Sequence, residues 1–261
     1  MFVLPIKLIR LMVSRGGTLW RGVWGRGGPR TLLWDCVMIM KEAQSFAFFD
    51  FDGTMIPGDS IAAFVRYARK RRIMPRRAFF RALLAAARYV LGLMNAADSK
   101  NAALRFRMRL SEQEREALDR EFVENCLLPR IYPQAKACIA SHRLAGRQPV
   151  IVTASTENYM RFVADALGVS ALLATPLNPD GTIGENCRGE EKPHRIHAWL
   201  REQGREADFA ASYAYGDSKS DLPMLLLCGH PVQVNPKKTL RQAAPDMEKV
   251  CWNENERGKK V

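Results

Sequence analysis

The chain has 261 residues, of which 47% are hydrophobic and 26% charged, an ordinary balance for a globular protein with a core and one inserted subdomain. Its formal net charge of +13 indicates anionic partners, namely nucleic acid, an anionic membrane surface or phosphorylated substrates. The six cysteines form no C-x-x-C pair. This spacing argues against a zinc site or a disulfide framework and is compatible with a reducing cytosol.

Residues 1–44 differ from the rest of the chain, because they are basic and glycine-rich and contain no acid before Asp35. The apolar start, residues 2–13, is interrupted by two basic residues and is too short to span a bilayer. It also lacks the cleavage pattern of a secretory signal. A membrane-surface amphipathic segment, a disordered basic arm and an extension upstream of a start at Met38 or Met40 remain open. We expect a disordered or non-native extension.

The most informative stretch is residues 46–54, which read Phe-Ala-Phe-Phe-Asp-Phe-Asp-Gly-Thr. An apolar run rich in aromatic residues is typical of a buried parallel strand. Asp50 and Asp52 stand at its carboxyl end, where open α/β sheets bind their ligands. Gly53 allows the chain to turn there without a steric penalty. The two carboxylates can then point in different directions, one as a nucleophile and the other as an acid or base. The alternative is an ordinary Asp-Gly surface turn.

A long helical region follows, over residues 59–147. Asp59 or Ser60 provides a helix N-cap, apolar residues then recur at spacings of three and four, and Ser111 with Glu114 forms a capping box. Thirteen basic residues and one acid lie between Arg66 and Arg109.

Residues 82–94 are apolar apart from Arg88, a pattern typical of a helix lying on a membrane surface. A helical subdomain that packs on itself, with its basic face in water, is the interpretation we favour for this region.

The second half of the chain predicts further strands at 148–153, 172–174, 212–216 and 232–234, and a charged, disordered tail at 251–261. Thr153 ends the first of them and precedes a helix, an arrangement that favours phosphate binding. Lys192 begins another helix, where a cation is unfavourable unless it reaches a bound anion.

Asp217 and Asp221 follow the strand at 212–216 and mirror the pair in the first motif. Carboxylate oxygens of this kind suit Mg²⁺, so Asp50, the Asp52 region and Asp217 predict a magnesium site.

The four motifs stand in an order that resembles the haloacid dehalogenase (HAD) superfamily, in the branch similar to phosphoserine phosphatase. They are Asp50-Phe-Asp-Gly-Thr54, Thr153 after an apolar strand, Lys192 before a helix, and Gly216-Asp-Ser-Lys-Ser-Asp221. The resemblance implies an α/β fold with a Rossmann-like, doubly wound parallel sheet. It places the catalytic core at 45–58 and 148–250 and an inserted all-helical cap at 59–147.

By this resemblance Asp50 is the nucleophile that forms an aspartyl-phosphate, and Asp52 is the general acid and then the base that activates water. The implied phosphate-binding residues are Gly53, Thr54, Thr153 and Lys192. The resemblance also implies a Mg²⁺ ion held by Asp50, Asp217 and the backbone carbonyl of Asp52, with Asp221 orienting the cluster from behind the ligands.

Substrate choice in this branch lies in the cap, where the sequence departs from phosphoserine phosphatases. Asp59 occupies the position at which phosphoserine phosphatases have a glutamate that binds the substrate amine. Their cap arginine, which binds the substrate carboxylate, has no clear counterpart in this sequence. The basic, apolar cap is similar to members that act on lipid phosphates, such as phosphatidylglycerophosphatases.

We therefore expect a Mg²⁺-dependent phosphomonoesterase acting on a small phosphorylated metabolite such as phosphoserine, with a lipid-phosphate phosphatase as the alternative. Transfer of phosphate to an acceptor other than water also stays open. We expect a cytoplasmic protein and leave open peripheral contact with the anionic inner face of the membrane. A basic membrane-binding or nucleic-acid-binding protein is the remaining class, but no nucleic-acid recognition motif appears.

Overall fold

The computed structural model describes residues 43–252. The expectations for residues 1–42 and for the tail from residue 253 onward therefore lie outside the described residues. Among the helices of residues 43–252, none is both long enough and apolar enough to cross a membrane.

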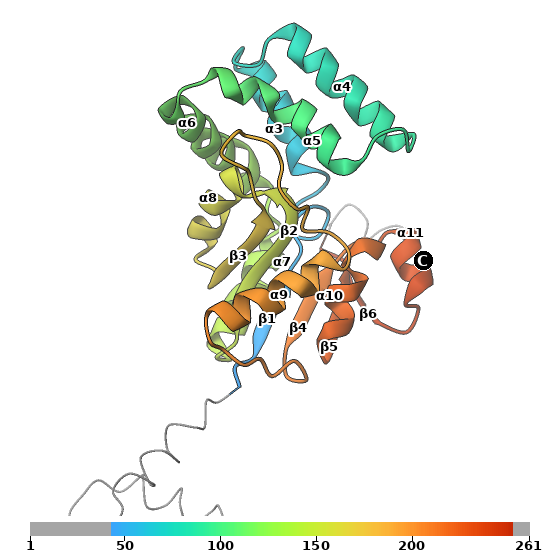
Figure 1. Cartoon of the computed structure of the whole chain (residues 1–261). Helices are drawn as coiled ribbons and strands as arrows, with labels where there is room; N and C mark the ends of the chain where they lie inside the picture. Colours follow the sequence, from blue (N-terminus) through green and yellow to red (C-terminus); the bar gives the residue numbers. More distant parts are fainter. Residues whose placement is uncertain (1–42, 253–261) are drawn as a thin grey trace, which may run out of the picture. The chain divides into compact units, whose positions relative to one another are not determined.

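The centre of the fold is a six-stranded sheet in which every neighbouring pair of strands is parallel (Figure 1). Its order is β3-β2-β1-β4-β5-β6, so the first strand of the described chain lies inside the sheet. The strands are β1 (Phe46–Phe49), β2 (Gln148–Thr156), β3 (Ala171–Thr175), β4 (Tyr213–Gly216), β5 (His230–Val234) and β6 (Glu248–Val250).

Helices cover both faces of the sheet. The side chains of each strand alternate between these faces, so one strand contributes to the packing on both sides. Ala47 and Phe49 of β1 pack in one cluster with α7 (Pro133–Leu144) and α8 (Glu157–Leu167). Phe46 and Phe48 pack in a second cluster, with the helices α9 (Glu191–Glu202), α10 (Leu222–Leu227) and α11 (Lys238–Ala243). Because both faces bury apolar residues, β1 reads as a continuous apolar run. The predicted doubly wound α/β fold is confirmed.

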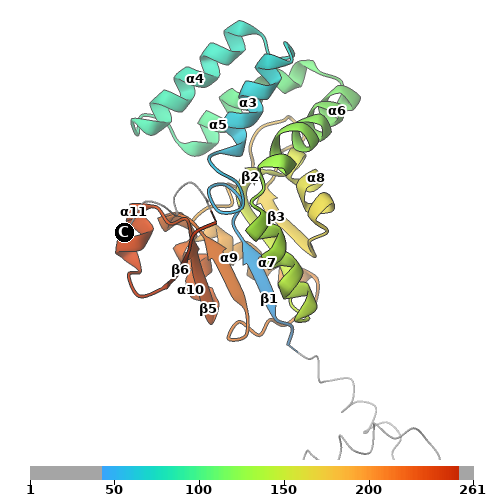
Figure 2. The same cartoon turned by 180° about the vertical axis from the view of Figure 1, so that it is seen from behind.

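The cap is built from helices inserted between β1 and β2, and Figures 1 and 2 show it beyond one end of the strands. Its helices are α3 (Ser60–Lys70), α4 (Arg76–Val90), α5 (Ala96–Leu104) and α6 (Glu112–Phe122). A shorter helical turn, Arg105–Arg109, lies between α5 and α6, and two more, Val123–Leu127 and Leu128–Arg130, follow α6. The predicted capping box of Ser111 and Glu114 is confirmed at the start of α6, and Asp59 is the N-cap of α3.

Aromatic rings join the cap to the core. The ring of Phe64 in α3 lies 5.0 Å from that of Phe122 in α6 and 5.6 Å from that of Tyr159 in α8, measured between centroids. All three side chains are fully buried. The cap and core therefore share one apolar cluster.

The two connections between core and cap are joined by hydrogen bonds. The backbone N–H of Tyr132 donates to the carbonyl oxygen of Met55, with N and O 2.9 Å apart. Arg130 donates a side-chain bond of 2.6 Å to the carbonyl oxygen of Pro57. We name residues 55–57 and 130–132 the stem of the cap.

The structure adds detail at the edges of the predicted elements. Helix α7 falls within the stretch 59–147 that we expect to be cap, yet it packs against β2 on the sheet (Figure 2). We therefore propose that the cap ends at the stem, before Pro133. The strand β6 and the helix α11 carry no sequence signal, because both are short and largely exposed and neither shows an apolar alternation.

Candidate active site

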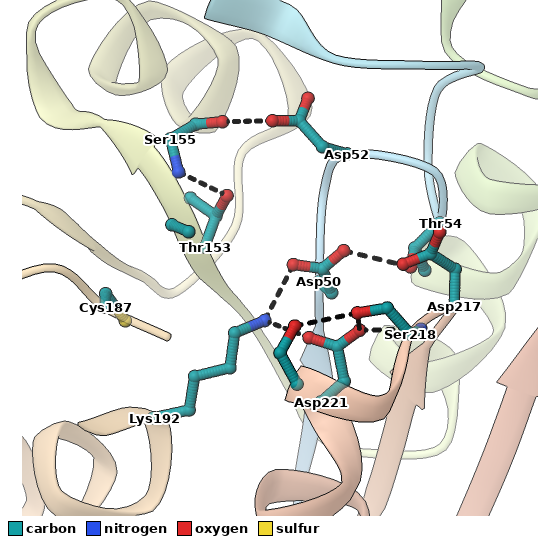
Figure 3. A network of polar contacts seen from close by, with 12 residues as sticks. Asp50, Asp52, Thr54, Thr153, Ser155, Cys187, Lys192, Asp217, Ser218 and Asp221 are labelled. Carbon is teal, nitrogen blue, oxygen red and sulfur yellow. Dashed lines mark hydrogen bonds and ion pairs between the residues drawn. The ribbon is translucent and has the colours of Figure 1, made fainter. Parts of the chain in front are cut away.

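The carboxyl ends of neighbouring strands bring the predicted site residues together (Figure 3). Asp50 follows β1 directly, Thr153 lies in β2 and Asp217 follows β4. Since β2, β1 and β4 are adjacent and parallel, their carboxyl ends meet at one edge of the sheet. All three side chains are buried.

Lys192 lies at the centre of the site, and its side chain is only 1% exposed. Its Nζ donates a 2.7 Å hydrogen bond to Oδ1 of Asp50 and a 2.6 Å bond to Oδ1 of Asp221. The other oxygen of Asp221 accepts bonds from the backbone N–H of Ser218 at 3.0 Å and from its hydroxyl at 2.8 Å. These bonds explain why a cation is tolerated at the start of α9.

Burial and the neighbouring charges shift the pKa values of the three groups in this cluster. Burial disfavours the charged ammonium of Lys192, but Asp221 and Asp50 outweigh that cost and raise its pKa above its usual value. Burial opposes the charged form of Asp221 as well, yet Lys192 and the bonds from Ser218 hold its pKa below the usual range. The pKa of Asp50 is raised to about 8 by burial, then by the charge of Asp221, against the pull of Lys192. Burial and the charge of Asp221 therefore both disfavour ionisation of Asp50.

Asp50, Asp217 and Asp221 could hold a metal ion, because one oxygen from each lies within 4.8 Å of the others. Asp217 also forms a 2.7 Å ion pair with Lys237, while burial raises the pKa of this carboxyl. Three buried carboxylates provide the oxygen donors that a hard dication prefers. The residues present thus fit Mg²⁺, whose charge would also favour the ionised form of these carboxyl groups. The side chain of Asp52 is not part of this group.

Gly53 allows the close approach of the first and fourth motifs. Its φ angle is +84°, and a Cβ atom on this residue would lie 2.1 Å from Oδ2 of Asp217. Only a glycine leaves that space to the carboxylate. Thr54 follows, and its hydroxyl donates to Oδ2 of Asp50 at 3.1 Å. Together with the bond from Lys192, this fixes both oxygens of Asp50.

Asp52 points away from the metal cluster, toward Ser155 (Figure 3). Its Oδ1 accepts a 2.9 Å bond from the backbone N–H of Ser60, and its Oδ2 accepts bonds from the hydroxyls of Ser60 at 3.0 Å and Ser155 at 2.5 Å. Burial, then the charge of Asp59, raises the pKa of Asp52 to about 7, against the effect of these bonds. A carboxyl group with such a pKa suits acid–base work near neutrality.

Thr153 and Ser155 form the β2 side of the site. The hydroxyl oxygen of Thr153 accepts a 3.0 Å bond from the backbone N–H of Ser155, and both residues are 1% exposed. Ser155, like Ser60, was not among the predicted site residues. Its position two residues beyond Thr153, in an extension of β2 past a register shift, gives no distinct pattern in the sequence.

Lys100 of the cap also reaches the site, although no motif in the sequence indicates this. Its Nζ donates to the carbonyl oxygen of Ala154 and, at 2.6 Å, to Oδ1 of Asn186. Burial lowers the pKa of Lys100 to about 8, while the charges of Asp59 and Asp52 oppose this shift. Asp59 itself is exposed and caps α3 through a 2.8 Å bond from the N–H of Ala62 to its Oδ1. A cap cation and a cap anion therefore lie near Asp52.

Comparison with known proteins agrees with this geometry. Residues 47–226 match the model of the haloacid dehalogenase-like hydrolase family, so the chain belongs to that family. It is 28% identical over 222 residues to a histidinol-phosphatase of Neisseria meningitidis, covering 78% of this chain and 96% of the relative. It is 30% identical to a phosphoserine phosphatase of Mycobacterium tuberculosis, covering 78% and 68% of the two chains.

Among solved structures, a Bordetella pertussis protein of unknown function superposes with a TM-score of 0.72 at 28% identity, covering 81% of this chain and all of that one. The family and the phosphatases among these relatives identify the chain as a phosphatase.

Proposed function

We propose that the protein is a Mg²⁺-dependent phosphomonoesterase that acts through an aspartyl-phosphate on Asp50. The observation that carries this proposal is the placement of Asp50 between Lys192 and Thr54, beside two further buried carboxylates and with Asp52 two residues away. A nucleophile, cations for a phosphoryl group and an acid–base group are the parts that covalent phosphate hydrolysis needs.

The reaction follows from these positions. A carboxylate oxygen of Asp50 attacks phosphorus and the phosphorus–oxygen bond to the leaving group breaks. Asp52 gives its proton to the leaving alkoxide, and it then takes a proton from the water that hydrolyses the acyl phosphate. Lys192 and the hydroxyl of Thr153 hold the phosphoryl oxygens, while the hydroxyl of Thr54 keeps Asp50 in position. When bound, Mg²⁺ neutralises charge between the carboxylates and the phosphate.

The cap residues favour a small substrate that carries an amine. Phosphoserine and histidinol phosphate, the substrates in the names of the two relatives, are both phosphate monoesters of 2-amino alcohols. Asp59 offers a carboxylate for such an amine, and Lys100 offers a cation for a carboxylate such as that of phosphoserine. We propose a phosphate ester of a 2-amino alcohol as the substrate class and phosphoserine as the first compound to test.

The covalent step can be tested by labelling. With ³²P-labelled p-nitrophenyl phosphate, whose leaving group needs no proton, and Mg²⁺, Asp52→Asn should accumulate labelled protein, because only the second step then needs Asp52. Asp50→Asn and the double variant should not be labelled and should release no phosphate. Asp165→Asn, an exposed control on α8, should behave like the wild type. Turnover by Asp50→Asn at the wild-type rate would falsify the assignment of the nucleophile.

The substrate class can be tested with three phosphate esters that differ in their charges. Lys100→Met should raise KM about 10-fold or more for phosphoserine and leave it unchanged for phosphoethanolamine, which has no carboxylate. Asp59→Asn should raise KM for both amines. Neither change should affect the KM for p-nitrophenyl phosphate, which has neither group. Equal effects on all three compounds, or turnover only of a lipid phosphate, would contradict this assignment.

A further inference from the structure

The cap exposes an apolar patch along α4 and the turn that follows it. Within residues 43–252, Leu144 and Leu226 are the only large apolar side chains of comparable exposure outside the cap. Contiguous exposed apolar residues on a single element mark an interaction surface. The apolar patch consists of Phe80 (66% exposed), Leu83, Leu84 (62%), Val90 (81%), Leu91 (71%) and Leu93.

The arrangement of α4 explains why these side chains point outward. The face of α4 that packs toward α5 is lined by small residues, and Ala82 and Ala85 are its buried positions. The large apolar residues occupy the opposite side. Figures 1 and 2 both show α4 at the edge of the cap farther from the sheet, with α5 nearer to it. An ordinary surface helix turns its large apolar residues toward the core, whereas α4 turns small residues inward and large apolar residues toward the solvent.

A stripe of arginines borders the apolar patch. Arg77, Arg81 and Arg88 are separated by four and seven residues, so they lie on one side of α4, and all three are exposed. Helix α4 contains no acidic residue. Thirteen basic residues and one acid lie between Arg66 and Arg109. A second copy of this chain would bring like charges together at the patch, whereas an anionic surface would pair with them.

We propose that α4 and the following turn dock the protein on an anionic lipid bilayer. The apolar patch inserts among the lipid chains at the interface while the bordering arginines contact the negatively charged headgroups. An apolar face with flanking arginines and a long helix parallel to the surface are what interfacial binding requires. This surface is separate from the residues of the active site, and its role does not depend on the proposed substrate.

Vesicle sedimentation tests the proposal with the full chain. Phosphatidylcholine vesicles with and without phosphatidylglycerol are the probes. The wild type should partition onto the anionic vesicles, and Phe80→Ser/Leu84→Ser/Leu91→Ser should partition at least about 10-fold less. Arg77→Gln/Arg81→Gln/Arg88→Gln should lose on the order of 100-fold on anionic vesicles, from about 5-fold for each arginine.

Matched controls separate the patch from general effects of charge and hydrophobicity. Leu144→Ser/Leu226→Ser removes exposed leucines elsewhere, and Arg201→Gln/Lys238→Gln/Arg241→Gln removes exposed cations from α9 and α11. Both controls should bind vesicles like the wild type, and hydrolysis of p-nitrophenyl phosphate should be unchanged in all four variants.

Three results would overturn the proposal. The first is a wild type that does not bind anionic vesicles, and the second is binding that the apolar variant retains in full. The third is a concentration-dependent dimer in analytical ultracentrifugation that Phe80→Ser/Leu84→Ser/Leu91→Ser abolishes, without vesicle binding by the wild type. That result would assign the patch to self-association.

Discussion

Gly53→Ala is the sharpest test of the site geometry, because the structure fixes what the added methyl group meets. The Cβ atom would lie 2.1 Å from Oδ2 of Asp217, whereas carbon and oxygen come no closer than about 3.3 Å even in weak hydrogen bonds. Asp217 must then withdraw by roughly 1 Å. A displacement of that size in catalytic machinery costs about 100-fold in rate. The positive φ of +84° adds a backbone cost of about 1–2 kcal/mol.

Gly146→Ala provides the matched control. Gly146 has a φ of +76°, and nothing lies within 4 Å of the position its Cβ would take. Urea denaturation should show a loss of about 1–2 kcal/mol for this variant with wild-type turnover. Gly53→Ala should show at least that loss, about 100-fold lower kcat and a higher Mg²⁺ requirement. If Gly53→Ala keeps wild-type kcat and Mg²⁺ dependence, the placement of Asp217 against Gly53 has no part in the reaction.

Three further predictions concern buried ionisable groups. Lys192→Met should lower kcat at least about 100-fold at saturating Mg²⁺, because it removes the cation between two carboxylates. Arg107→Met should lower the free energy of unfolding in urea by about 3 kcal/mol, because it leaves Asp119 buried without its ion pair. His142 is buried with its pKa lowered to about 4, so the unfolded chain binds its proton more readily and stability should fall as pH drops from about 6.5 to 4. His142→Phe should remove up to about 3 kcal/mol of that pH dependence, as measured by urea denaturation at several pH values.

Each of these three predictions would be contradicted by a specific result. Full turnover by Lys192→Met would exclude a role for this ammonium in holding phosphate. A change below about 1 kcal/mol for Arg107→Met would mean that Asp119 finds another partner or takes up a proton. An unchanged pH profile in His142→Phe would assign the acid sensitivity of the fold to other groups.

The sequence was sufficient to predict the fold class, because the apolar residues of β1 and the polar residues of the site follow one another directly in the chain. The apolar residues Phe46 to Phe49 indicate a strand buried on both faces, and the polar residues directly after it predict a ligand site at its carboxyl end. Lys192 is a different case, since its position at a helix start was ambiguous until the structure placed two carboxylates against it. The roles assigned to these residues remain predictions.

Lys100 and Ser60 could not be predicted in the same way. Lys100 is one of thirteen basic residues in its region, and only the packing of α5 against the core brings its side chain to Ala154 and Asn186. Ser60 carries a cap signal for α3, and that signal does not reveal that its hydroxyl also reaches Asp52. Contacts between segments far apart in the chain depend on how the cap and core pack, which periodicity and motif spacing do not report.

The stem of the cap has a consequence for how such a protein can diversify. The chain leaves the core and returns to it at neighbouring positions, which are joined by the hydrogen bond between Tyr132 and Met55. It then passes through α7 into β2, a strand adjacent to the one it left. Everything between these points is topologically a loop, however large it is. A different lid of another length could be grafted onto the same two residues without rethreading the sheet or moving Asp50. New substrate preferences could therefore arise by exchange of this module, while the hydrolytic machinery is inherited unchanged.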